Sequence, residues 1–220
     1  MRLSMEQNEV IEKTVQFVKE ELAGAEGGHD WWHIRRVWKL AQKISETEEV
    51  DTFVVQLGAL LHDIADSKFN DGDETVGPRK AREFLSSLGV EQAVIEHVEK
   101  VISNISFKGG NHEQAFKSPE LDVIQDADRL DAIGAIGIAR AFNYGGFKGQ
   151  EFYNPEIKPK FNMTKGRIQK SKATYNQPLL RKTALAKGQN EHSDGQKNGN
   201  TAARIHGEIS GSFYKDGRDA

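Results

Sequence analysis

The chain has no cysteine, only 5 prolines in 220 residues, and no long run of apolar side chains. The lack of cysteine excludes disulfide bonds and thiolate metal ligands, and it is typical of a reducing compartment. No stretch approaches the ~18 uninterrupted apolar residues of a membrane-spanning helix, and the start MRLSMEQNEV contains no apolar signal region. We therefore expect a soluble, cytoplasmic protein.

The alternating pattern of a half-buried β-strand is also missing, whereas apolar residues recur at helical spacing. Ile11, Val15 and Val18 lie on one face of a predicted helix. Asp30 and Asp51 each precede a further apolar stripe, where an aspartate is a favoured N-cap. The pattern predicts an all-α protein.

Three more helices are expected farther along the chain. One follows Pro78 and ends near Gly89, the next carries the apolar positions of residues 94–102, and the last is a single long helix from Leu121 to Phe142. A chain of this length can bury one sizeable core, so a single folded domain is expected.

Four side chains stand out as candidate metal ligands. His33 occurs in HDWWHIRRV, His62 and Asp63 in LGALLHDIADSK, and Asp128 in IQDADRLDAIGAIG. Nitrogen and oxygen donors of this kind suit Mn²⁺, Mg²⁺, Fe²⁺ or Co²⁺. A buried His–Asp pair is often only a satisfied hydrogen bond, but three carboxylates within DADRLD are costly to bring together unless a cation compensates them.

These three phrases resemble the HD-domain metal-dependent phosphohydrolases, and most closely the small bacterial HD proteins that act on nucleoside triphosphates. The resemblance extends over about residues 5–172. It implies an HD-domain helical bundle in which a divalent metal lies between helices, held by His33, His62, Asp63 and Asp128. It also implies hydrolysis of a phosphate ester or anhydride of a nucleotide, such as a (deoxy)nucleoside triphosphate.

Further residues are expected around the metal. Asp66 is four residues after His62, and the resemblance implies that an acidic residue three places after the HD aspartate removes a proton from the attacking water. Asp131, three residues beyond Asp128, is expected either to support a ligand or to contact the sugar. Arg129 is expected to bind phosphate or to form an ion pair within its helix. The remaining expectations are phosphate binding by Arg36 and Lys68, and a supporting position for His29.

Two other functions stay open. The enzyme could be a 5′-nucleotidase or an alarmone hydrolase, or the chain could be a nucleotide-binding sensor without turnover. In each case the expected partner is a nucleotide or another phosphorylated small molecule, with no membrane and with a homodimer possible.

The end of the chain differs in charge and pattern from the rest. From Lys158 onward there are 13 lysines and arginines against 5 acidic residues, whereas the earlier part has 17 against 28. The apolar period vanishes from about Tyr175, so we expect an HD domain over residues 1–174 and an unstructured tail over 175–220. Simple disorder explains such a tail, and so does a nucleic-acid-binding arm.

A shifted reading frame explains the tail better. Back-translation from NQPLLRKTALAKGQ onward, read one base later, permits an amphipathic, leucine-rich run like the C-terminal helix of these HD proteins. We therefore expect the tail to be out of frame, which makes nucleic-acid binding unlikely.

Overall fold

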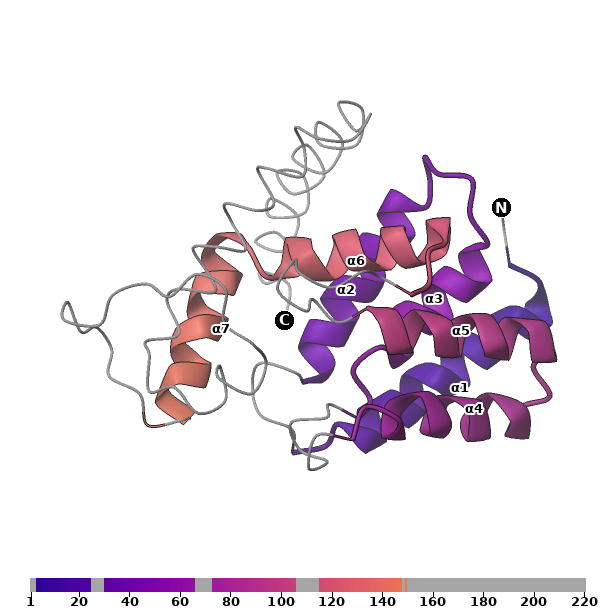
Figure 1. Ribbon diagram of the computed structural model, residues 1–220, viewed down its shortest axis with the longest axis horizontal. Coiled ribbons are helices and arrows are strands. Elements are labelled where there is room, and N and C mark those ends of the chain that lie inside the picture. Colours follow the sequence, from indigo (N-terminus) through magenta and orange to yellow (C-terminus); the bar gives the residue numbers. More distant parts are fainter. Residues whose placement is uncertain (1–2, 25–29, 66–72, 106–114, 148, 150–220) are drawn as a thin grey trace, which may run out of the picture.

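The computed structural model describes residues 3–24, 30–65, 73–105, 115–147 and 149. Within these ranges the chain forms seven helices and no strand, which confirms the predicted all-α class. In chain order they are α1 (Met5–Glu21), α2 (Trp31–Ile44), α3 (Thr52–Leu61), α4 (Val76–Ser87), α5 (Gln92–Asn104), α6 (Pro119–Asp131) and α7 (Gly134–Phe147). Figure 1 shows α1 to α6 gathered in one bundle, with α7 set apart at the end of α6.

Helix α3 lies at the centre of the bundle because its sequence is apolar on every side. Residues 53–61 are all buried, and the helix contacts α1, α2, α5 and α6. A helix that is apolar all round needs neighbours all round, and these four supply them. No described helix, α3 included, is both long and apolar enough to cross a membrane.

Side-chain caps determine where the helices of the candidate site begin. The Asp30 carboxylate accepts a hydrogen bond from the backbone N–H of His33, and Asp51 accepts from the first backbone N–H groups of α3. Both predicted caps are confirmed. Ser118 caps α6 in the same way, by accepting from the backbone N–H of Leu121. These bonds satisfy N–H groups that have no partner inside their helix.

The prediction of one helix from Leu121 to Phe142 is wrong. The chain leaves α6 after Asp131 and starts α7 at Gly134. Gly137 explains how the two helices meet, because a Cβ atom at this position would lie 2.3 Å from the carbonyl oxygen of Ala132. Apolar periodicity runs on through the break, so the pattern alone did not reveal it.

The start of α4 was also predicted too late. The helix begins at Val76, before Pro78, because the first turn of a helix tolerates a residue without a backbone N–H.

Candidate metal centre

Three helices bring the predicted ligands together. His33 lies near the start of α2, His62 and Asp63 directly follow the last residue of α3, and Asp128 lies in α6. Helix α2 packs against both α3 and α6, so the three segments meet at one place in the bundle (Figure 1). One ligand atom from each of His33, His62 and Asp128 lies within 4.8 Å of the other two.

Asp63 completes this group. One of its carboxylate oxygens lies 3.6 Å from Nε2 of His33 and 3.7 Å from Nε2 of His62. An Asp128 oxygen lies 3.6 Å from the same nitrogen of His33. The two histidines are buried, whereas the aspartate side chains keep 22% and 35% of their surface exposed. The group therefore has a buried nitrogen side and a partly open oxygen side.

His62 has one ring nitrogen engaged and the other directed into the group. The sequence pattern places all four candidate ligands in helical segments, which is wrong for His62 and Asp63, because α3 ends at Leu61 and His62 is its C-cap. Nδ1 of His62 donates to the backbone carbonyl of Ala59 at 2.9 Å. The neutral ring then carries its lone pair on Nε2. That nitrogen is buried and has no hydrogen-bond partner among the described residues, as expected for a metal ligand.

His33 is oriented by a carboxylate behind it. Its Nδ1 lies 2.8 Å from an oxygen of Asp131, whose side chain is 3% exposed. Burial raises the pKa of Asp131, but the hydrogen bonds from His33 and Arg36 outweigh it and hold the pKa well below the ordinary value. Burial lowers the pKa of His33, but its hydrogen bonds to Asp131 and Asp63 leave that pKa above the ordinary value.

Comparison with known proteins identifies the family of this chain. The sequence model of the HD domain matches residues 31–133. YpgQ of Bacillus subtilis, an uncharacterized protein, is 38% identical over 153 residues, which cover 69% of this chain and 74% of YpgQ. The solved structure of an HD-superfamily hydrolase from Bacillus thuringiensis is 35% identical, with a TM-score of 0.61 over 97% of this chain and 100% of that one. This chain belongs to the HD-domain family of metal-dependent phosphohydrolases.

One solved relative carries a nucleotide. The structure of B. subtilis YpgQ in complex with ADP is 30% identical to this HD protein and has a TM-score of 0.58. It covers 84% of this chain and 97% of YpgQ.

The other predicted residues of the HD centre have separate positions. Arg36 forms two hydrogen bonds with Asp131, at 2.6 and 3.1 Å, so its guanidinium is engaged beside the centre. Arg129 donates to Gln125 within α6 at 3.2 Å and lies 3.6 Å from Asp126, so contacts within the helix, the second of its two expected roles, are observed. Of the two roles expected of Asp131, support of a ligand is the one whose contacts are present. His29, Asp66 and Lys68 lie outside the described residues.

Sequence analysis missed one residue of the HD centre. Nη1 of Arg140 in α7 lies 2.8 Å from the Asp131 carboxylate. No motif marks this arginine, and in a continuous helix its side chain would lie two and a half turns from Asp131. Only the break between α6 and α7 brings the two side chains together.

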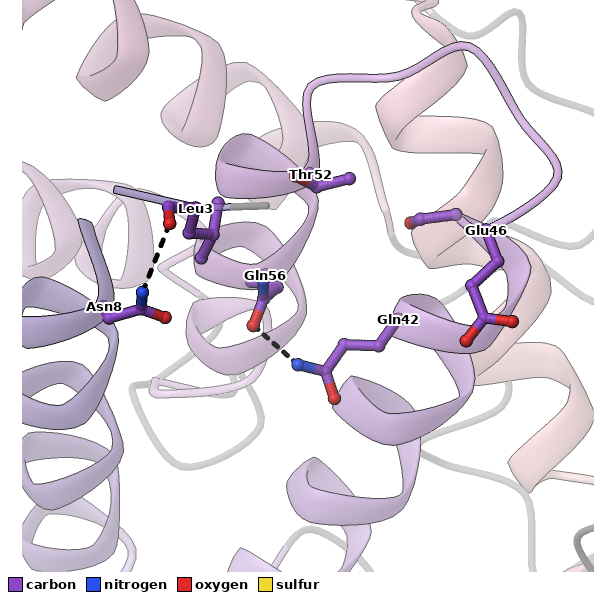
Figure 2. A pocket seen from close by; sticks show the side chains of 7 residues that line it. Leu3, Asn8, Gln42, Glu46, Thr52 and Gln56 are labelled. Carbon is purple, nitrogen blue, oxygen red and sulfur yellow. Dashed lines mark hydrogen bonds between the residues drawn. The ribbon is translucent and has the colours of Figure 1, made fainter. Parts of the chain in front are cut away.

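The HD centre is separate from the hollow shown in Figure 2, which has a volume of about 450 Å³. Residues of α1, α2, α3 and the segments that flank them line that hollow, and none of them is a predicted ligand. The side-chain amides of the hollow have partners within the bundle. Gln56 accepts from Gln42 at 2.7 Å and from the Trp38 indole at 3.1 Å, and Asn8 donates to the backbone carbonyl of Ser4 at 2.8 Å. We interpret the hollow as a structural feature of the bundle.

Proposed function

We propose that this HD-family phosphohydrolase cleaves a phosphate ester or anhydride of a nucleotide, namely of a nucleoside triphosphate. The observation that carries the proposal is the buried Nε2 of His62, which has no hydrogen-bond partner among the described residues and faces the carboxylate of Asp63. The ADP complex of YpgQ supports a nucleotide as the substrate class, since that relative binds one.

We propose His33, His62, Asp63 and Asp128 as the ligands of one divalent cation, such as Mn²⁺, Mg²⁺, Fe²⁺ or Co²⁺. Two neutral imidazoles and two carboxylates balance a 2+ charge, and all four are donors that such ions accept. When bound, a divalent metal polarises a phosphoryl oxygen and lowers the pKa of water.

The protein supplies orientation and proton transfer. The carbonyl of Ala59 and the carboxylate of Asp131 hold the two imidazoles by Nδ1, which leaves both Nε2 atoms directed into the centre. The exposed sides of Asp63 and Asp128 leave an approach for a charged substrate. We propose that Asp66 removes the proton of the attacking water, and that Lys68 binds phosphate.

A nucleotide panel tests the proposal. The purified protein is incubated with nucleoside mono-, di- and triphosphates and with guanosine tetraphosphate in Mn²⁺, Mg²⁺ or Co²⁺, and the products are separated. Release of pyrophosphate or phosphate from a triphosphate is expected. Release from monophosphates alone would indicate a 5′-nucleotidase, release from the tetraphosphate alone an alarmone hydrolase, and binding without release a sensor. Each of these outcomes contradicts the triphosphate assignment.

Removing a ligand tests the metal centre itself. We expect H62A and D63A to lose both bound metal and hydrolysis, because neither ligand has a substitute nearby. Elemental analysis after metal loading and desalting measures occupancy. R82M is the control, since Arg82 pairs with Glu99 between α4 and α5 and touches none of the ligands. Full metal occupancy in both alanine variants would remove the proposed site.

A further inference from the structure

The buried carboxylate of Asp131 accepts hydrogen bonds from residues of two helices. From α2, Nδ1 of His33 lies 2.8 Å from Oδ2 of Asp131. Arg36, also in α2, donates from Nε to Oδ1 at 2.6 Å and from Nη2 to Oδ2 at 3.1 Å. From α7, Nη1 of Arg140 lies 2.8 Å from Oδ2, and the same nitrogen is 3.4 Å from the backbone carbonyl of Asp131. Oδ2 is therefore shared by His33, Arg36 and Arg140, so α7 supplies one of the three contacts that hold this oxygen.

The charge of the Asp131 carboxylate determines which ring nitrogen of His33 carries the proton. Between two guanidinium groups Asp131 is ionised, and an ionised carboxylate only accepts hydrogen bonds. Nδ1 of His33 is therefore the donor. In a neutral ring this leaves the lone pair on Nε2, the atom that lies 3.6 Å from Asp63 and from Asp128. The tautomer suited to binding a cation depends on Asp131 keeping its place.

We propose that Arg140 is a positioning residue of the metal centre, which from α7 holds the Asp131 carboxylate against Nδ1 of His33 and so fixes the tautomer and orientation of that ligand. The inference rests on the metal centre proposed above and adds a second requirement, correct docking of α7. Arg140 donates hydrogen bonds to the carboxylate and to the backbone carbonyl of Asp131, and we infer that it acts through this residue.

The packing of α7 shows how Arg140 reaches its place. Gly137 lies one turn before Arg140, and its missing Cβ is what allows α7 to start beside the carbonyl of Ala132. Any side chain at Gly137 must push the first turn of α7 away from the end of α6, because the obstructing atoms are backbone. A substitution there should therefore move Arg140 from Asp131 without changing its charge.

Metal binding and ring tautomer, measured without any turnover, test the proposal. Metal-free wild type, R140M, R140K, G137A and R82M are titrated with Mn²⁺ by calorimetry. The ring nitrogens of ¹⁵N-labelled His33 are assigned by NMR at a pH where the ring is neutral. We expect R140M and G137A to bind Mn²⁺ roughly tenfold more weakly, at the lower end of the effect of supporting residues around metal ligands. R140K should recover part of the loss, and R82M should match the wild type.

The NMR signature separates positioning from general stability. In the wild type, His33 should be the Nδ1–H tautomer, and in R140M it should become a mixture of both. A lower melting temperature in R140M with unchanged Mn²⁺ affinity and tautomer would overturn the inference, because Arg140 would then only hold α7. The H62A variant distinguishes an error in the proposed metal centre from an error in the proposed role of Arg140. If H62A binds Mn²⁺ like the wild type, the metal centre itself is wrong. If H62A loses Mn²⁺ and R140M does not, only the role of Arg140 is wrong.

Discussion

The two histidines of the centre are held by different kinds of acceptor. His62, the C-cap of α3, uses the carbonyl of Ala59 three residues earlier, so its orientation is local and follows from the end of α3. His33 uses the carboxylate of Asp131, which comes from another helix. One histidine is therefore oriented by secondary structure and the other by tertiary structure, so changes in packing should affect His33 first.

The residue to which we assign proton transfer gives a kinetic prediction. We expect D66N to keep its metal but to lower kcat by roughly 10²–10⁴-fold, the usual contribution of a general base. Asp66 lies outside the described residues, so its role is a prediction from sequence. Metal analysis and steady-state kinetics on the same preparation measure the two effects.

A matched aspartate serves as the control for that experiment. Asp73 is exposed, and among the described residues it accepts hydrogen bonds from Thr75 alone, so D73N should leave kcat unchanged. An unchanged kcat in D66N would exclude Asp66 as the base and direct attention to His29.

How much of the centre was predictable depends on how each residue is specified. His33, His62, Asp63 and Asp128 are marked by local patterns, and the structure brings all four together. The position of Arg140 beside Asp131 depends on the break between α6 and α7, and the apolar pattern of the sequence does not predict this break. The candidate ligands are therefore readable from short motifs, whereas the groups that orient them require the fold.

At the scale of elements, the central helix α3 packs especially closely against its neighbours at Gly58. Gly58 in α3 faces both α5 and α6, and a Cβ atom there would lie 2.6 Å from Cδ1 of Ile124 and 3.2 Å from Cγ1 of Val101. Both neighbours are fully buried. The missing side chain lets α3 approach α6 closely, which keeps His62 and Asp63 near Asp128.

This contact predicts a loss of stability. G58V should lower the free energy of unfolding by about 1–3 kcal/mol, because extra methyl groups in a packed core force side chains and backbone to shift. For a chain of this size the melting temperature should fall by about 2–4 °C per kcal/mol.

G146A is the matched control, since nothing lies within 4 Å of a Cβ at Gly146 in α7. It should keep or slightly raise the melting temperature, because alanine favours a helix over glycine. Equal melting temperatures for G58V and the wild type would show that α3 and α6 can separate without loss of stability.

The elements themselves were largely predictable, and the exceptions have physical causes. Caps at Asp30 and Asp51 were readable because a side-chain acceptor next to an apolar stripe is a local signal. The division of the last predicted helix was not, because the apolar pattern continues through it. Its cause is a close backbone approach at Gly137, which depends on α7 already lying beside α6.

At the scale of the whole molecule, exposed apolar side chains are concentrated on one helix. Within the described ranges six large apolar residues are exposed, and four of these lie in α7, namely Ile136, Ile138, Phe142 and Phe147. Helix α7 is also the element on which we propose that the orientation of His33 depends. Contacts that stabilise α7 should therefore affect the metal centre as well as the stability of the fold.

The reading frame of the tail should affect the stability of the whole molecule. Residues 175–220 lie outside the described residues, and their assignment as an out-of-frame segment remains a prediction from the sequence. Restoring the frame near Tyr175 should add an amphipathic helix. Burying its apolar face contributes about 25 cal/mol per Å², which amounts to several kcal/mol. The free energy of unfolding of a typical protein is only about 5–15 kcal/mol. We therefore expect the frame-restored protein to melt at a higher temperature and to bind Mn²⁺ at least as tightly.

Limited proteolysis and hydrogen exchange compare the two chains directly. In the chain as written, cleavage should begin beyond Tyr175 and the amide protons there should exchange almost without protection, whereas the restored segment should be protected. The coding DNA offers an independent control, since the shifted frame must continue with a sequence like that of other HD proteins. A protected tail in the chain as written, or a shifted frame without such a continuation, would contradict the frameshift. The 13 basic residues from Lys158 onward would then call for nucleic-acid binding measured over a range of salt concentrations, because phosphate contacts weaken steeply as salt rises.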